Sequence, residues 1–300
     1  MTAYYRVPGR IELLGKHVDY AGGISLTCAV DRALSVRVDV LQEPVVRLRS
    51  TTQPPVELPL STSAQRPAEI WGTYARAVIR RLCRDFPDIS RGVEVTISSN
   101  LPASAGLSSS SALTIALATA LVDANELDRS ARWQSAIPDT ATRAEYFGAL
   151  ETGAAFGPFE GDEGVGVAGG AQDHVAILCA RDQHCGLFGY LPATVRRYIP
   201  WPRDYLFAIA VSGVEATKTG NARDLYNRTS NSLRALLAAW NAASGSTHHS
   251  LQAALDGASD AEATLLKLAS AGIGLAGRRA NLNASHWPDL PCQAEAFQGT

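Results

Sequence analysis

Residues 101–112 read LPASAGLSSSSA, and the apolar stretch LTIALATALV follows directly at 113–122. Just before this segment, Val93, Val95 and Ile97 alternate with other residues, which predicts a strand over 93–97. A helix without a polar face is buried in the middle of its domain. The order predicted here decides the fold: a strand, a turn of small residues and a buried central helix.

The same segment is a candidate anion site. The first turn of a helix has unpaired N–H groups and a partial positive charge, so phosphate oxygens bind there. Small residues let a phosphate approach the backbone, and serine hydroxyls add donors or ligate magnesium. No Gly-Lys-Ser/Thr follows, so this is not a Walker loop. A serine-capped core helix with a flexible entry loop explains the segment equally well.

Strands and helices alternate along the rest of the chain. Leu34, Val36 and Val38 alternate with polar residues, which is the period of a half-buried strand. A mixed α and β class follows. Working outward, we predict strands over 34–40 and 45–48, and a buried strand over 206–211. Helices are predicted over 71–82 and 140–152, and a mostly helical stretch over 225–268 with an interruption at 244–250. Residues 53–67 are predicted to form a turn-rich excursion on the surface.

Composition limits the classes of function. The 300 residues suit one large or two modest domains, and 27 Lys and Arg against 29 Asp and Glu leave no basic excess. We therefore expect no nucleic-acid partner. We also expect no membrane association, because no apolar run of about 18 residues and no signal peptide is visible. Five scattered cysteines do not resemble a disulfide framework, so we expect a cytoplasmic protein.

Two further segments carry polar groups. Residues 7–23, VPGRIELLGKHVDYAGG, suit recognition of a polyhydroxylated ligand, and a solvated loop is the alternative. In GGAQDH, residues 169–174, a carboxylate held against glycines suits a general base, although turn chemistry alone also explains it. The spacing of Cys179, His184 and Cys185 matches no common zinc pattern, and we interpret this stretch as a turn between two strands.

Taken together, these segments resemble the GHMP small-molecule kinases, and within them the galactokinase group. Residues 8–23 match the first family motif nearly position for position, and 106–112 match the Gly-Leu-Ser-Ser-Ser motif. Residues 170–173 match a Gly-x-x-Asp element, and 226–228 resemble a Tyr-Asn-x-Arg element. The resemblance implies an α+β fold of two lobes. Residues 1–190 would form a ribosomal-S5-like N-terminal domain, and 191–300 the start of a ferredoxin-like domain.

GHMP kinases carry a third, glycine-rich motif in the second domain. No such element follows residue 230. We therefore expect the second domain to be incomplete. A truncated sequence explains this better than the alternative, a diverged family member.

The resemblance also implies roles for single residues. Asp173 would be the catalytic base, and Arg10 would stabilise charge on the transferring phosphoryl group. Magnesium would be held by Ser110 and Glu151, with Glu160 and Glu163 as alternatives, because Glu151 precedes Asp173 by more residues than is usual. The sugar contacts would be Lys16, His17, Asp19, Gly170 and Tyr226. The nucleotide-binding loop would comprise Ser104, Ala105, Gly106, Leu107, Ser108, Ser109, Ser110 and Ser111.

The implied function is ATP-dependent phosphorylation of the anomeric hydroxyl of a sugar, with ATP and Mg²⁺ as cofactors. Lys16 stands where the family has Glu, so the sugar expected is an acidic one such as a uronic acid; alternatively, Lys16 turns outward or pairs with Glu12. Another GHMP small-molecule kinase, or a non-catalytic regulator that senses sugar and ATP, remains an alternative. For the oligomeric state, both a monomer and a weak dimer stay open.

Overall fold

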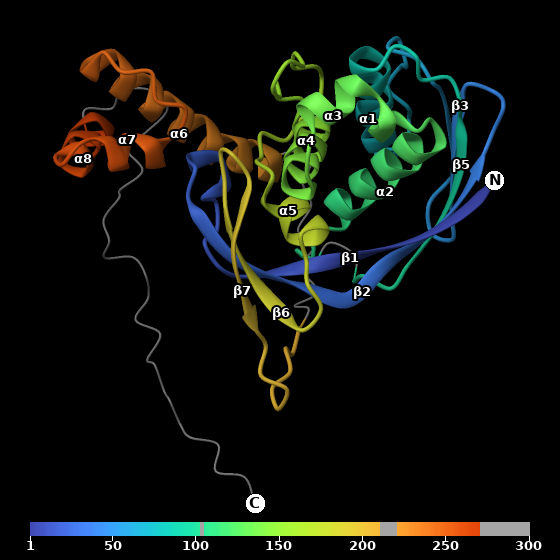
Figure 1. The fold of residues 1–300 in the computed structure, drawn as a ribbon, viewed down its shortest axis with the longest axis horizontal. Coiled ribbons are helices and arrows are strands. Elements are labelled where there is room, and N and C mark those ends of the chain that lie inside the picture. The colour runs from blue at the N-terminus through green and yellow to red at the C-terminus, as the bar shows by residue number, and fades with distance from the viewer. Residues whose placement is uncertain (103–104, 211–220, 271–300) are drawn as a thin grey trace, which may run out of the picture.

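The computed structural model describes residues 1–102, 105–210 and 221–270, and within 221–226 the backbone alone. Its N-terminal part is built on one mixed sheet with helices packed on it (Figure 1). The sheet has seven strands: β1 (Thr2–Leu14), β2 (Ile24–Val40), β3 (Val45–Ser50), β4 (Val56–Pro59), β5 (Val93–Ser99), β6 (His184–Gly189) and β7 (Thr194–Pro200).

The long strand β2 organises this sheet. It pairs with β1 along one side. On its other side, its first residues pair with β6 and its last residues pair with β5. All pairings are antiparallel except the parallel pair of β3 and β5. Side chains alternate as expected in β2, where Leu34, Val36 and Val38 are buried while Ser35 and Arg37 are exposed.

Helices cover one face of the sheet (Figure 1). The central helix α2 packs against β1, β2 and β5 and is flanked by other helices of this layer. Its residues Ala112, Ile115 and Leu117 are buried, because the helix carries small or apolar side chains on every face. The helices of this part are α1 (Gly72–Asp85), α2 (Ser109–Ala124), α3 (Ala131–Ala136), α4 (Thr140–Thr152) and α5 (Gln172–Leu178), with short 3-10 turns at Asp19–Ala21 and Leu127–Arg129.

Helix α4 ends at a glycine that the local geometry requires. Gly153 has φ +82°, and a Cβ there would lie 2.1 Å from the carbonyl oxygen of Asp162. The segment that follows, residues 153–164, folds back onto α1. Arginines of α1 hold it: Arg81 Nη1 donates to the carbonyl oxygen of Ala154 at 2.7 Å, and Arg76 Nη2 lies 2.7 Å from Glu163 Oε2. These residues lie in the sequence between Glu151 and Asp173.

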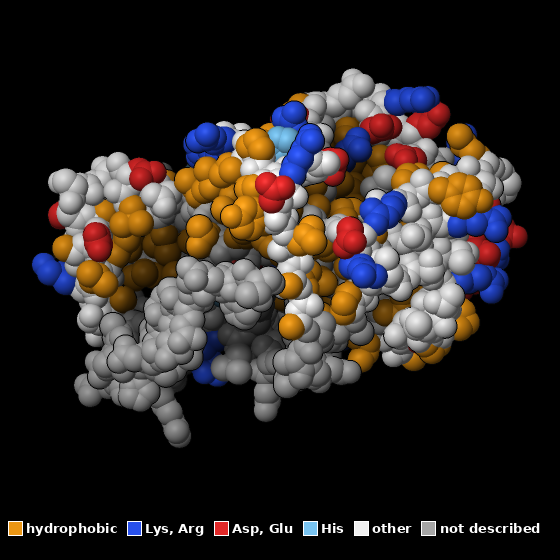
Figure 2. Space-filling view, turned by 90° about the horizontal axis from the view of Figure 1, so that it is seen from below, with side chains coloured by type: hydrophobic (Ala, Val, Ile, Leu, Met, Phe, Trp, Pro, Cys, Tyr) orange, Lys and Arg blue, Asp and Glu red, His pale blue; other side chains and the backbone are white. Residues whose placement is uncertain are grey.

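A second group of helices lies beside the sheet: α6 (Asn221–Ser244), α7 (Leu251–Gly257) and α8 (Ala261–Ser270). Trp240, Leu251 and Leu265 form part of their small core. The group touches the N-terminal part at Gly22, where a Cβ would lie 2.5 Å from Ser250 Oγ. Figure 2 shows hydrophobic side chains among charged ones on the surface of this group, at the left of the view.

Most elements predicted from the sequence are confirmed, as the bounds of β2, β3, β5, α1, α2 and α4 show. The helical stretch and its interruption between α6 and α7 are confirmed over the described residues. Strands β6 and β7 pair on either side of the domain boundary expected near residue 190. That boundary, the ferredoxin-like assignment and the truncation stay predictions; residues 221–270 contribute helices and no strand to the described part.

Three predictions were wrong. Residues 206–210 form no strand, and Leu206 is 95 % exposed, because this apolar run finds no partner strand among the described residues; Val211 lies outside them. The excursion over 53–67 contains β4, whose Val56 and Leu58 are buried. Cys179 caps helix α5, so the stretch to Cys185 joins a helix to a strand, not two strands.

Across residues 1–102, 105–210 and 221–270, no helix combines the length and the hydrophobicity that a bilayer span requires.

Candidate active site

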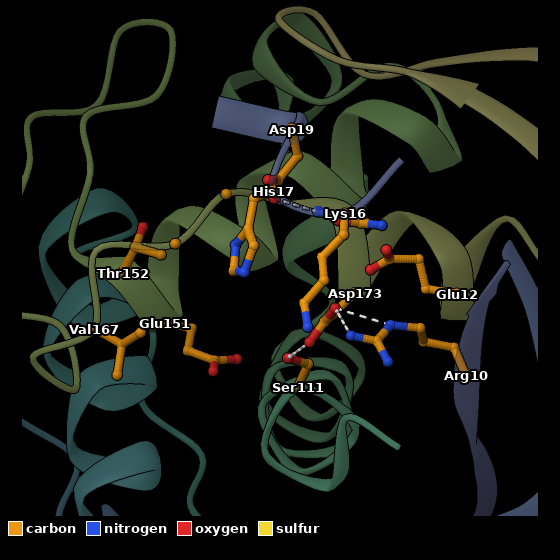
Figure 3. A pocket seen from close by; sticks show the side chains of 13 residues that line it. Arg10, Glu12, Lys16, His17, Asp19, Ser111, Glu151, Thr152, Val167 and Asp173 are labelled. Carbon is orange, nitrogen blue, oxygen red and sulfur yellow. Dashed lines mark hydrogen bonds and ion pairs between the residues drawn. The ribbon is translucent and has the colours of Figure 1, made fainter. Parts of the chain in front are cut away.

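One cavity gathers polar side chains from five segments that are far apart in the sequence. Its volume is about 130 Å³. Strand β1 and the following turn, the start of α2, the end of α4, the stretch 167–170 and the start of α5 all contribute (Figure 3). The cavity is lined by Arg10, Glu12, Lys16, His17, Asp19, Ser111, Glu151, Thr152, Val167, Gly169, Gly170, Gln172 and Asp173.

Arg10 connects Asp173 to the serine-rich loop. Its Nε donates to Asp173 Oδ1 at 2.9 Å, and its Nη2 donates to the same oxygen. Its Nη1 donates to the carbonyl oxygen of Gly106 at 2.8 Å, and its backbone N–H donates to the carbonyl oxygen of Leu107 at 3.2 Å. From α2, Ser111 Oγ lies 3.3 Å from Asp173 Oδ2. The carboxylate of Asp173 is thus oriented by a cation and by the helix that the loop enters.

Asp19 is a buried carboxyl beside this pair. Its Oδ2 accepts from the backbone N–H of Gln172 at 3.2 Å. Burial raises the pKa of Asp19, the hydrogen bond from Gln172 lowers it, and the negative charge of Asp173 raises it again. Gly170 is needed here, because a Cβ would lie 2.3 Å from Asp19 Oδ2. The glycines of this turn therefore let the chain pass directly over the carboxyl group.

Glu151, from the last turn of α4, points into the cavity from the other side (Figure 3). Its Oε2 lies 3.1 Å from His174 Nε2 and accepts from Thr114 Oγ1 at 3.2 Å. The same Thr114 hydroxyl lies 3.2 Å from the carbonyl oxygen of Ser110. Tyr74 hydrogen-bonds Ser110, and burial together with the charge of Glu151 raises the pKa of Tyr74 to about 12. Ser110 and Glu151 therefore share two neighbours.

This arrangement fits a magnesium ion, which prefers carboxylate and hydroxyl oxygens and binds alongside phosphate groups. Glu160 and Glu163 do not line the cavity, and the Glu163 carboxylate pairs with Arg76 instead. Glu151 is thus the better placed of the three candidates. Within the described residues, no cluster of three or more His, Cys, Asp or Glu side chains is arranged to hold a metal, so the Cys179 and Cys185 region has no such group.

The loop before α2 fits an anion such as a nucleotide phosphate. Gly106 has φ +72°, with no atom within 4 Å of the place where a Cβ would be, so the backbone is open to a ligand there. Ser108, at the helix N-cap, is buried, and its hydroxyl has no hydrogen-bond partner among the described residues. The first N–H groups of α2 are unpaired within the helix. Ser104 lies outside the described residues.

Lys16 reaches into the cavity from the turn that also carries His17 (Figure 3). Across the part of the chain that the structure describes, Lys16 makes no ion pair, although Glu12 lines the same cavity. Among the described residues Lys16 and Glu12 form no ion pair, and the Lys16 side chain is exposed at the edge of the cavity that it lines. The ammonium group is therefore one of two cations, with Arg10, that a ligand in the cavity meets.

Sequence reasoning missed one side chain at this site, His174, and the contacts of another, Asn227. His174 follows Asp173 directly and contacts Glu151, a contact that no local pattern indicates. Asn227 of α6 accepts from the backbone N–H of Ala168 at 2.7 Å and donates to the carbonyl oxygen of Gly166 at 3.0 Å. It thereby clamps the stretch on both sides of Val167. Asn227 belongs to the Tyr-Asn-x-Arg element; the side chain of Tyr226 lies outside the described residues.

Comparison with known families identifies this part of the chain. Residues 73–154 match the GHMP kinases N terminal domain, and residues 2–39 match the galactokinase galactose-binding signature. The chain contains a GHMP kinase N-terminal domain. The two matched regions of this domain carry Arg10, Lys16, His17, Asp19, the serine-rich loop and Glu151.

Curated relatives are similar to part of this chain. Galactokinase from Haemophilus influenzae strain PittGG is 30% identical over 118 residues, and galactokinase from Lacticaseibacillus casei strain BL23 is 34% identical over 117 residues. These matches cover 39% and 38% of this chain and 30% of each relative, so the chain matches less than a third of their length.

The structure of Lactococcus lactis galactokinase complexed with galactose is similar with a TM-score of 0.59 and 21% identity, over 89% of this chain and 65% of that one. This likeness supports the fold alone. The predicted mixed α and β fold of the GHMP kinases is thereby confirmed.

Proposed function

We propose that this protein is an ATP-dependent sugar kinase that phosphorylates the anomeric hydroxyl group of its substrate. The observation that carries the proposal is the position of Arg10, which contacts both Asp173 and the loop that enters α2. A base and an anion site joined by one guanidinium are the parts that phosphoryl transfer requires, since that reaction depends mainly on positioning and charge.

In this proposal each residue has a defined task. Asp173 accepts the proton of the sugar hydroxyl as its oxygen attacks the transferring phosphorus. Arg10 orients Asp173 and stabilises the charge that develops on the phosphoryl oxygens. Ser108 and the first N–H groups of α2 bind phosphate oxygens. When bound, ATP would supply the phosphoryl group and leave as ADP with the sugar phosphate; Ser110 and Glu151 would hold a magnesium ion, which would neutralise charge.

The substrate contacts follow from the same cavity. Asp19 accepts hydrogen bonds from vicinal hydroxyls of the sugar. His17, Lys16 and the Gly170 backbone line the same cavity and contact the sugar as well. The assignment of Tyr226 to the sugar stays a prediction. A cytoplasmic location and the absence of nucleic-acid partners also stay predictions.

The test is release of ADP with a panel of reducing sugars, followed by localisation of the phosphate by ³¹P and ¹³C NMR. We expect turnover with at least one sugar and phosphorylation at the anomeric carbon. Phosphorylation of a different hydroxyl would favour another small-molecule kinase. Binding of sugar and ATP without any ADP would favour a sensor and contradict the proposal.

We further propose that the preferred sugar is acidic. Lys16 lines the cavity and makes no ion pair within the described residues, so its ammonium group is available to pair with a ligand carboxylate. Galacturonate and galactose differ only in this group and are the matched pair of substrates. We expect kcat/KM to favour galacturonate, and Lys16→Glu to reverse the preference. Equal or better use of galactose by the wild type would contradict this assignment.

A further inference from the structure

A second cavity adjoins the candidate active site. Its volume is about 230 Å³, against about 130 Å³ for the first cavity. Asp19, Thr152, Gly169 and Gly170 line both cavities, so the two share one wall. The second cavity lies between the N-terminal part and the helical group, because residues of α4, α6 and α7 line it.

The order of residues along these two cavities gives them a direction. Asp173 lines the first cavity and not the second, whereas Arg234 lines the second and not the first. Asp19 and Gly170 lie between these ends. A sugar whose reacting hydroxyl group faces Asp173 therefore turns its far end toward the second cavity.

The inner wall of the second cavity holds an unsatisfied donor. The hydroxyl of Tyr20 is buried and has no hydrogen-bond partner among the described residues. Burial, followed by the charge of Asp19, raises the pKa of Tyr20 to about 12, so the group is a neutral donor at neutral pH. An unpaired buried hydroxyl costs about 1–3 kcal/mol, which a ligand acceptor recovers.

The mouth of the cavity carries a cation over apolar walls. Arg234 is exposed, and its positive charge lies close enough to Tyr20 to lower the pKa of that hydroxyl. Within residues 1–102, 105–210 and 221–270, Arg234 forms no ion pair. Leu233, Leu237 and Leu251 supply the apolar wall. Of the carboxyl groups in the lining, Glu145 already accepts from the backbone N–H of Ala193 at 3.0 Å.

We propose that this cavity is a second subsite for an acidic substrate larger than one sugar ring. The phosphorylated ring occupies the first cavity, and a further ring or substituent occupies the second, with its anionic group at Arg234 and an acceptor atom at the Tyr20 hydroxyl. A uronic-acid disaccharide with a free anomeric hydroxyl group has this chemistry, since its two carboxylates match Lys16 and Arg234. The inference rests on the proposed function for the orientation of the sugar.

The experiment is calorimetric binding of four probes to the full chain: galactose, galacturonate, α-1,4-linked digalacturonate and the neutral galactose disaccharide of the same linkage. We expect digalacturonate to bind about tenfold more tightly than galacturonate, the size of one charge-assisted hydrogen bond. Arg234→Gln should remove most of this advantage and leave galacturonate binding unchanged. Tyr20→Phe, which keeps the ring, should weaken digalacturonate binding several-fold.

Arg203→Gln is the matched control, because Arg203 is exposed and lines neither cavity. Equal binding of galacturonate and digalacturonate overturns the subsite. An advantage that survives Arg234→Gln, or equal binding of the neutral disaccharide, overturns the anionic assignment. Binding is measured without turnover, so failure of the kinase proposal appears separately, as absence of ADP in the presence of ATP.

Discussion

Asn227 offers the sharpest test of how the helical group supports the active site. Its side chain makes two hydrogen bonds to the stretch around Val167, at 2.7 Å and 3.0 Å. Each such bond contributes about 0.5–1.5 kcal/mol, so Asn227→Ala should weaken the anchoring of this stretch by about 1–3 kcal/mol. Val167, Gly169 and Gly170 line the cavity, so the loss falls on the wall that faces the substrate.

The expected result is a fall in kcat/KM of about tenfold for Asn227→Ala, since 1.4 kcal/mol is a factor of ten. Asn227→Asp keeps the acceptor for the Ala168 N–H and loses the donor to Gly166, so an intermediate fall is expected. The assay is steady-state ADP release with the best sugar of the panel, together with urea unfolding of each variant.

The chain contains a close control in the same helix. Asn241 donates to the carbonyl oxygen of His248 at 2.9 Å and accepts from its N–H at 3.1 Å, away from the cavity. Asn241→Ala should cost similar stability and leave kcat/KM within about twofold of the wild type. Equal kcat/KM for the two alanine variants would refute a positioning role for Asn227 and leave it a purely structural residue.

Three other predictions concern stability and the buried carboxyl groups. Arg81→Met removes the partner of Asp85, 2.6 Å away and buried with it, and should cost about 3–5 kcal/mol of unfolding free energy by urea titration. Gly170→Ala forces a methyl group against Asp19 and should cost about 1–3 kcal/mol together with most of the activity. Asp19→Asn removes a carboxyl whose pKa burial raises. Such a group costs the folded state stability as pH rises above its unfolded pKa of about 3.9, so the variant should gain stability relative to wild type as pH rises from about 4.

Each of these predictions has a control or a contrary outcome. Arg47→Met removes exposed ion pairs with Glu43 and Glu57 and should cost no more than about 1 kcal/mol. Gly157→Ala meets no atom within 4 Å and lines neither cavity; its φ of +49° adds about 1–2 kcal/mol of backbone strain, but the variant should keep the activity that Gly170→Ala loses. A stability difference between Asp19→Asn and wild type that stays constant with pH would show that the Asp19 pKa is not raised.

The fold could be predicted where a periodic pattern was long. The alternation in β2 and the uniformly apolar α2 each indicated one structure, and Gly153 marked the end of α4. The run at 206–210 failed because a short apolar stretch has no period, and only a partner strand decides its structure. Strand β4 was missed because prolines around it indicated turns.

The candidate site was predictable only in part. Arg10, Asp19 and Asp173 came from motifs, and the structure brings them into one cavity. The contact of His174 with Glu151 and the hydrogen bonds of Asn227 join residues far apart in sequence. The Tyr-Asn-x-Arg element drew attention to Asn227, but no local pattern indicates what either side chain contacts. The second cavity depends on how the helical group lies against Tyr20, which no sequence pattern encodes.

The central claim is that Asp173, joined by Arg10 to the serine-rich loop, is the base for phosphoryl transfer. The most direct test is kcat for ADP release by wild type and Asp173→Asn at saturating sugar and ATP. A positioned base contributes about 10²–10⁴-fold, so we predict a loss of that size in kcat with unchanged ATP binding by calorimetry. A kcat for Asp173→Asn within a few-fold of wild type would contradict the claim.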